Sequence, residues 1–157
     1  MNGAEQSDDL TILTIKYTNV KKQLIIKNNI SQISLLQEFV ECTGQELSLS
    51  PALVMNLNLV LEEAVSNIIL YAYPSGVSQD IVIEVQKTNN SLIFVITDTG
   101  IEFDITKAKE ANITLSAEER PIGGLGIFLI KKIMDKVAYS RIDNTNILTL
   151  EKNLETV

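Results

Sequence analysis

The chain has 157 residues, of which 45% are hydrophobic and 21% are charged, a composition that favours a folded globular domain over a disordered chain. Its 13 basic and 20 acidic residues give a net charge of -7, which disfavours non-specific binding to nucleic acid and to anionic membrane surfaces. The single cysteine and the absence of histidine exclude an internal disulfide and the usual zinc ligand sets. We expect a flexible tail at residues 1–9 and a single domain over residues 10–157.

The amino terminus is polar and acidic, whereas a signal peptide needs a basic start followed by an apolar run. No apolar run approaches the ~20 residues that span a bilayer. These features predict a cytoplasmic protein without a membrane segment. We interpret Cys42 as a small buried hydrophobic residue.

The first predicted elements are two strands and a helix. Runs rich in β-branched residues at 10–16 and 23–27, with a polar connection between them, indicate a hairpin. Apolar residues then recur at helical spacing over residues 30–40, and either Asn29 or Ser31 could cap the start of this helix.

Gly44 is the predicted end of that first helix, and a second helix with stronger signals follows it. Ser50 is a suitable N-cap and Pro51 fits the first helical position. Apolar residues recur at three- and four-residue steps as far as Ile68, and residues 74–76 (PSG) end the helix.

Two further strands are predicted at residues 81–85 and 91–97. They indicate a second hairpin, and the second strand is almost wholly apolar, so it should be central and buried. Residues 105–120 form a polar segment that is long for a connection within a domain. Such segments are often lids over a binding site.

The last predicted elements are a helix over residues 125–137 and a hairpin formed by residues 137–142 and 146–150 across Asp143 and Asn144. Strands and helices thus occur in blocks, and hairpins link most of the strands. This order predicts an α+β fold, a two-layer sandwich with a mixed, mostly antiparallel sheet and helices on one face.

Three short segments could carry chemistry, and the first is Glu63 and Asn67 on the second helix. Four residues apart, they project from the same helix face. The carboxylate could polarise a hydroxyl group or water, and the amide oxygen is a suitable ligand for a cation such as magnesium. Taken alone, the pair equally fits an exposed polar face of a helix.

The second segment, residues 98–104 (DTGIEFD), directly follows the predicted buried strand. Asp98 could accept a hydrogen bond from a ligand amine, and Gly100 lets the backbone approach a flat ring closely. Taken alone, the segment also fits a surface turn.

The third segment is the glycine cluster at residues 123–126 (GGLG), which opens a helix. Closely spaced glycines free backbone N–H groups to surround an anion, and the helix N-terminus adds a favourable dipole. The segment lacks the lysine of a Walker A loop and the spacing of a dinucleotide fingerprint. Glycines that only break a loop before a helix are the alternative.

Together and in this order, E-x-x-x-N, D-x-G-x-x-F-D, a polar segment and G-G-L-G resemble the N, G1 and G2 boxes of the Bergerat-fold ATPases. Within that superfamily, EEAVSNIILYAYP and GGLGIFLIKKIMDKV are similar to the corresponding segments of the small bacterial anti-sigma factor serine/threonine kinases. The resemblance spans nearly the whole chain and implies a histidine-kinase-like ATPase domain that uses ATP and Mg²⁺.

The resemblance assigns roles by position. It implies Glu63 as the catalytic base, Asn67 as the magnesium ligand, and Asp98 as the partner of the adenine amino group. The remaining nucleotide-binding positions that it implies are Gly100, Phe103, Arg120, Gly123, Gly124, Leu125 and Gly126.

Three positions depart from the family pattern. Tyr71 stands where the family often has histidine, and Ile68 replaces the usual small residue after Asn67. Residues 144–147 (NTNI) stand where many relatives carry Gly-Thr before the last strand. The resemblance therefore gives no role to Tyr71 and places no threonine beside the base.

The leading functional hypothesis is a kinase that phosphorylates a small anti-anti-sigma protein and otherwise sequesters a sigma factor. A homodimer is implied by the resemblance only. The alternative is a non-catalytic ATP-binding switch that binds and releases a partner. A two-component sensor is disfavoured, because the chain has no histidine to phosphorylate.

Overall fold

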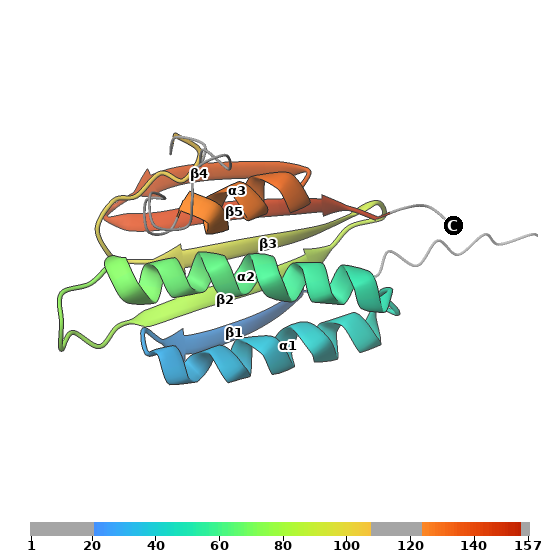
Figure 1. Ribbon diagram of the computed structural model, residues 1–157, viewed down its shortest axis with the longest axis horizontal. Helices are drawn as coiled ribbons and strands as arrows, with labels where there is room; N and C mark the ends of the chain where they lie inside the picture. Colours follow the sequence, from blue (N-terminus) through green and yellow to red (C-terminus); the bar gives the residue numbers. More distant parts are fainter. Residues whose placement is uncertain (1–20, 108–123, 155–157) are drawn as a thin grey trace, which may run out of the picture.

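The computed structural model describes residues 21–107 and 124–154, which form one sheet with helices on one of its faces (Figure 1). The strands are β1 (Lys21–Lys27), β2 (Asp80–Lys87), β3 (Ser91–Asp98), β4 (Lys136–Ile142) and β5 (Thr145–Asn153). The helices are α1 (Ile33–Glu46), α2 (Pro51–Tyr71) and α3 (Gly124–Ile133), with a short 3-10 turn, η1 (Ile30–Gln32), before α1. The strand order among the described residues is β1-β2-β3-β5-β4, and every pairing is antiparallel. This confirms the predicted two-layer α+β sandwich.

The core lies between the sheet and the three helices. β3 is the middle strand, as predicted, and Leu92, Phe94 and Ile96 are fully buried on its helix-facing side. Side chains alternate between the two faces of a strand, so Asp98 continues this buried series at the end of β3. β3 therefore carries apolar core residues along its length and the Asp98 carboxylate at its end.

α2 forms as its sequence signals predict. The Ser50 hydroxyl accepts a hydrogen bond from the Leu53 backbone N at 3.3 Å, and Pro51 is the first helical residue. By length and composition α2 is apolar enough to cross a membrane, but Val60 and Leu61 are fully buried in the fold. Part of its apolar surface therefore packs in the core, while Met55, Leu59 and Leu70 are exposed.

The predicted end of the first helix is wrong. α1 continues through Gly44 to Glu46, and a Cβ atom at Gly44 would overlap the Val54 side chain of α2. The glycine therefore serves the close approach of two helices, although a glycine near the end of an apolar pattern resembles a helix stop. The start of this region is as predicted, since Asn29 Oδ1 accepts a hydrogen bond from the Ser31 backbone N at 3.0 Å.

Cys42 is exposed, so its interpretation as a buried hydrophobic residue is wrong. It lies on the solvent side of α1, whose buried positions include Leu36 and Val40. Its small size and weak polarity gave no indication of which helix face it occupies.

The last helix is shorter than predicted. α3 ends at Ile133, whereas the apolar spacing extended it to Val137, which lies in β4. The chain leaves the helix because the Asp135 backbone N donates to the Glu151 carbonyl of β5 at 2.9 Å. The hairpin that follows is confirmed, and its turn residues Asp143 and Asn144 have φ angles of 47° and 62°, the left-handed conformation of a tight hairpin turn.

Several sequence predictions lie outside the described residues. Among them are the tail at residues 1–9, the strand at 10–16, and the part of the polar 105–120 segment that follows residue 107.

Candidate functional site

The register of β3 and β5 brings two buried polar residues face to face. Asp98 lies opposite Asn146 in the antiparallel pairing, and the two residues are 5% and 6% exposed. Asn146 Nδ2 donates to Asp98 Oδ1 at 2.9 Å, and the Gly100 backbone N donates to the same oxygen at 2.8 Å. One oxygen of the carboxylate is thus held by two donors.

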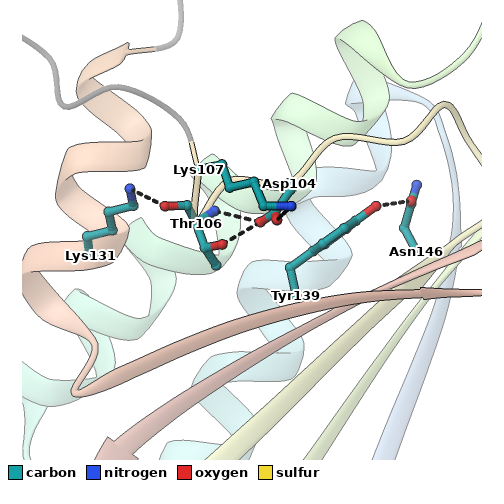
Figure 2. Close-up of polar contacts among 6 residues, drawn as sticks. All are labelled: Asp104, Thr106, Lys107, Lys131, Tyr139 and Asn146. Atoms are coloured by element: carbon teal, nitrogen blue, oxygen red, sulfur yellow. Dashed lines mark hydrogen bonds and ion pairs between the residues drawn. The ribbon is translucent and has the colours of Figure 1, made fainter.

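Two side chains of β4 donate hydrogen bonds to Asn146. The Tyr139 hydroxyl donates to Asn146 Oδ1 at 2.7 Å, a contact drawn in Figure 2, and Arg141 Nη1 donates to the same atom. Arg141 Nη1 also donates to the Gly100 carbonyl at 3.0 Å. The residues at the end of β3 are therefore tied to both strands of the last hairpin.

The second oxygen of Asp98 has a different environment. Within residues 21–107 and 124–154 no hydrogen-bond donor meets Asp98 Oδ2, although the residue is almost fully buried. The buried side-chain atoms that lack a partner among the described residues are Asn58 Oδ1 and Asn67 Nδ2, so Asp98 Oδ2 is open to the surface. It is a ready acceptor for an N–H group of a bound ligand.

The loop after β3 packs against the end of α2. A Cβ atom at Gly100 would lie 2.5 Å from Ala72 Cβ and 2.7 Å from the Ala72 carbonyl oxygen. Ile101 N donates to that carbonyl at 2.9 Å, and Thr99 N donates to the Tyr73 hydroxyl at 3.0 Å. Only glycine fits this close approach, so Gly100 is needed for the packing of the loop itself.

Glu63 and Asn67 lie on the same helix, with α3 beside them. Both side chains are half-buried. A Cβ atom at Gly126 would overlap Glu63 Oε2 and lie 2.9 Å from its Cδ, so the first described turn of α3 sits on the Glu63 carboxylate. At 1.5 Å per residue, Glu63, Asn67 and the Gly100 contact at Ala72 follow one another over about 14 Å of the helix. α2 therefore joins the three segments singled out in the sequence.

The remaining predicted site residues are placed as follows. Phe103 and Leu125 are 52% and 45% exposed, and Gly124 is half-buried at the start of α3. Arg120 and Gly123 lie outside the described residues.

The loop folds around Asp104 before it reaches residue 107. Thr106 donates to Asp104 Oδ1 from its backbone N at 2.9 Å and its hydroxyl at 2.6 Å, and the Lys107 ammonium lies 3.1 Å from Oδ2 (Figure 2). Burial acts to raise the pKa of Asp104, but the hydrogen bonds and the Lys107 charge outweigh it and hold the pKa below the ordinary 3.8. Lys131 of α3 donates to the Thr106 carbonyl at 3.1 Å.

The donor set fits a magnesium ion bound together with phosphate groups. Asn67 Nδ2 is buried and lacks a partner among the described residues, so no contact there fixes which way the amide points, and its oxygen can occupy that position instead. In the described part of the chain no three His, Cys, Asp or Glu side chains cluster. This suits Mg²⁺, which takes one or two protein ligands plus phosphate oxygens and waters, and not a metal that needs a full protein cage.

Comparison with known proteins agrees with this arrangement. The family described as histidine kinase-like ATPase domain matches residues 26–152, and the chain belongs to this family. Serine/threonine-protein kinase BtrW of Bordetella bronchiseptica is 31% identical over 101 residues, which cover 64% of this chain and 71% of that protein.

Two further relatives carry related names. Serine-protein kinase RsbW of Listeria innocua is 30% identical over 88 residues, 54% of this chain and 56% of that protein. RsbW of Bacillus thuringiensis is 27% identical over 99 residues, 60% of this chain and 61% of that protein. The matches to the RsbW proteins thus span less than two thirds of those proteins. The resemblance to small serine/threonine kinases is confirmed.

Sequence reasoning missed the hydrogen-bond network that holds Asp98, which consists of Asn146, Arg141 and Tyr139. A signal was present for Asn146. Asn146, Leu148 and Leu150 alternate along one predicted strand and all three are buried. A polar residue on the apolar side of such an alternation requires a buried polar partner.

Proposed function

We propose that this chain is an ATP-dependent serine/threonine protein kinase of the cytoplasm that phosphorylates a small anti-anti-sigma protein and sequesters a sigma factor. Membership of the histidine kinase-like ATPase family and the kinase names of the relatives support the enzyme class. The observation that carries the nucleotide part is the buried Asp98, whose Oδ2 has no donor within the described residues. The partners and a homodimeric state rest on the resemblance of the motifs.

In this proposal the adenine ring of ATP lies at the end of β3. Asp98 Oδ2 accepts a hydrogen bond from the adenine amino group, and Gly100 lets the ring lie close to the backbone. Phe103 covers the exposed side of the adenine ring, and Arg120 is the candidate to bind the terminal phosphate. The backbone around Gly123, Gly124, Leu125 and Gly126 surrounds the phosphates, as glycines before a helix are suited to do.

The transfer step needs a base and a positioned phosphate. The serine or threonine hydroxyl of the acceptor attacks the γ-phosphorus, the bond to the β–γ bridging oxygen breaks, and the hydroxyl proton passes to Glu63. Asn67 would hold Mg²⁺, which supplies charge neutralisation at the phosphates when it is bound. Glu63 lies four residues before Asn67, so both side chains project from one face of α2.

The experiment uses two neighbouring carboxylates. Glu63→Gln should lower transfer of labelled phosphate from ATP to the cognate acceptor by about a hundredfold or more, because removal of a general base costs 10²–10⁴-fold. Glu62→Gln is the matched control. Glu62 accepts a hydrogen bond from Gln37 at 3.1 Å on the α1 side of the helix, so its loss should leave the transfer rate within about threefold.

The alternative is a non-catalytic ATP-binding switch, and the packing of Gly126 on Glu63 Oε2 favours it, since this contact restricts the access of an acceptor hydroxyl to the carboxylate. The same experiment separates the two functions. Equal transfer by Glu63→Gln and wild type removes Glu63 as the base. No transfer by wild type with ATP binding intact supports the switch, and an absence of ATP binding contradicts both.

A further inference from the structure

Asn146 differs from the other polar residues of the site because all its hydrogen-bonding capacity is used within the fold. Its Oδ1 accepts from Tyr139 and Arg141, and its Nδ2 faces Asp98 Oδ1 at 2.9 Å and the Ile101 carbonyl at 3.0 Å. A hydroxyl and a guanidinium both donate, so the atom between them must be the amide oxygen. The orientation of this amide is therefore fixed by its partners.

The fixed amide in turn fixes the Asp98 carboxylate. Asp98 Oδ1 accepts from Asn146 Nδ2 at 2.9 Å and from the Gly100 backbone N at 2.8 Å. An oxygen of a carboxylate has two lone pairs, so these two donors fill it. Oδ2 is then the one acceptor that Asp98 can offer to a ligand.

A single acceptor distinguishes between purines. Adenine offers one amino group on the edge that faces such a carboxylate, and one oxygen satisfies it. Guanine offers two adjacent donors, N1–H and the 2-amino group, and a carboxylate matches this pair only with both oxygens. With Oδ1 filled, a guanine in the pocket would leave a buried donor without a partner.

We propose that Asn146, held by Tyr139 and Arg141 of β4, is a positioning residue that makes the pocket selective for adenine over guanine by occupying one oxygen of Asp98. This inference rests on the proposed nucleotide site. It goes further by assigning base selection to the last hairpin, which supplies no residue of the three sequence motifs.

The test measures the dissociation constants of ATP, GTP and purine riboside triphosphate, which lacks the amino group. Wild type should prefer ATP over GTP by about a hundredfold, and ATP over purine riboside triphosphate by about tenfold. Asn146→Ala removes one of the two donors to Oδ1 and so frees one of its lone pairs. The preference for ATP over GTP should then fall by about tenfold or more. Tyr139→Phe keeps the ring but removes one donor to Asn146, so the preference for ATP over GTP should fall by about threefold.

Ser140→Ala is the control, because Ser140 is an exposed residue between Tyr139 and Arg141 on the same strand. It should leave all three constants unchanged, and melting temperatures without nucleotide establish that each variant is folded. If Asn146→Ala fails to fold, the ratio of the GTP and ATP dissociation constants of Tyr139→Phe tests the inference. A wild type that prefers ATP while both variants keep the same ratio overturns the inference alone. A wild type that binds no nucleotide, or does not distinguish ATP from purine riboside triphosphate, overturns the proposed adenine site as well.

Discussion

The backbone of Gly126 lies directly against the carboxylate of Glu63, so closely that a Cβ atom there would overlap Oε2 and lie 2.9 Å from Cδ. This glycine belongs to the segment proposed to surround phosphates, and Glu63 is the proposed base. Their contact means that the position of α3 determines where the base can point.

Gly126→Ala should therefore displace Glu63. We expect phosphate transfer to fall by about a hundredfold, as misplacement of a catalytic group by about 1 Å can do. The atoms that would overlap are the end of a flexible side chain, which can move aside, so the melting temperature should change little. Transfer by Gly126→Ala at the wild-type rate would contradict the role of this contact in placing Glu63.

Gly100→Ala should damage the loop against which the adenine ring is proposed to lie. The added Cβ would lie 2.5 Å from Ala72 Cβ and 2.9 Å from Asp98 Oδ1, and none of these atoms can rotate away easily. We expect a loss of about 1–3 kcal/mol in the free energy of unfolding, measured in urea, and weaker ATP binding. Thr99→Ala, at the exposed neighbouring position, is the control and should change neither quantity measurably.

The Asp104 loop should weaken at low pH. Burial raises the pKa of Asp104, but hydrogen bonds from Thr106 and the charge of Lys107 outweigh it and lower the pKa below 3.8. A carboxyl group with a lowered pKa in the folded state contributes stability above its unfolded pKa, and loses it as the pH falls through the folded value. The difference in unfolding free energy between wild type and Asp104→Asn should be constant above about pH 5 and shrink below about pH 3.8.

The control for this titration is Glu102→Gln at an exposed position of the same loop. Its difference from wild type should stay small across the range. A difference for Asp104→Asn that grew as the pH fell would show that the carboxyl group destabilises the loop, contrary to its contacts.

Local signals predicted much of the fold. The Ser50 and Pro51 start of α2 and the turn at Asp143 and Asn144 depend on residues close in sequence, so the sequence alone predicts them. The burial of β3 followed from its almost wholly apolar composition. β3 is the middle strand of the sheet, and Asp98 lies at its end.

The errors came from contacts between distant parts of the chain. Gly44 stays helical because α2 packs against it at Val54, and α3 ends early because Asp135 pairs with β5 at Glu151. Neither partner can be identified from the spacing of apolar residues. The same reason explains why Asn146 was missed, since its position beside Asp98 depends on the register of two strands that are distant in sequence.

In the candidate site, too, local motifs could be predicted and contacts between distant parts of the chain could not. The sequence motifs pointed to Glu63, Asn67 and Asp98, whose roles stay predictions for the experiments above. They gave no information about what surrounds these residues, namely the Gly126 contact and the Tyr139, Arg141 and Asn146 network. Motifs report which groups are present, and the strand register determines which oxygen of Asp98 is available.

The separation of 48 positions between Asp98 and Asn146 also has a consequence for protein synthesis. A chain still emerging from the ribosome can expose Glu63, Asn67 and Asp98 while β5 is inside the exit tunnel, and at that stage no amide holds the Asp98 carboxylate. The proposed discrimination between purines therefore requires β5 to be paired with β3 and cannot precede that step of folding.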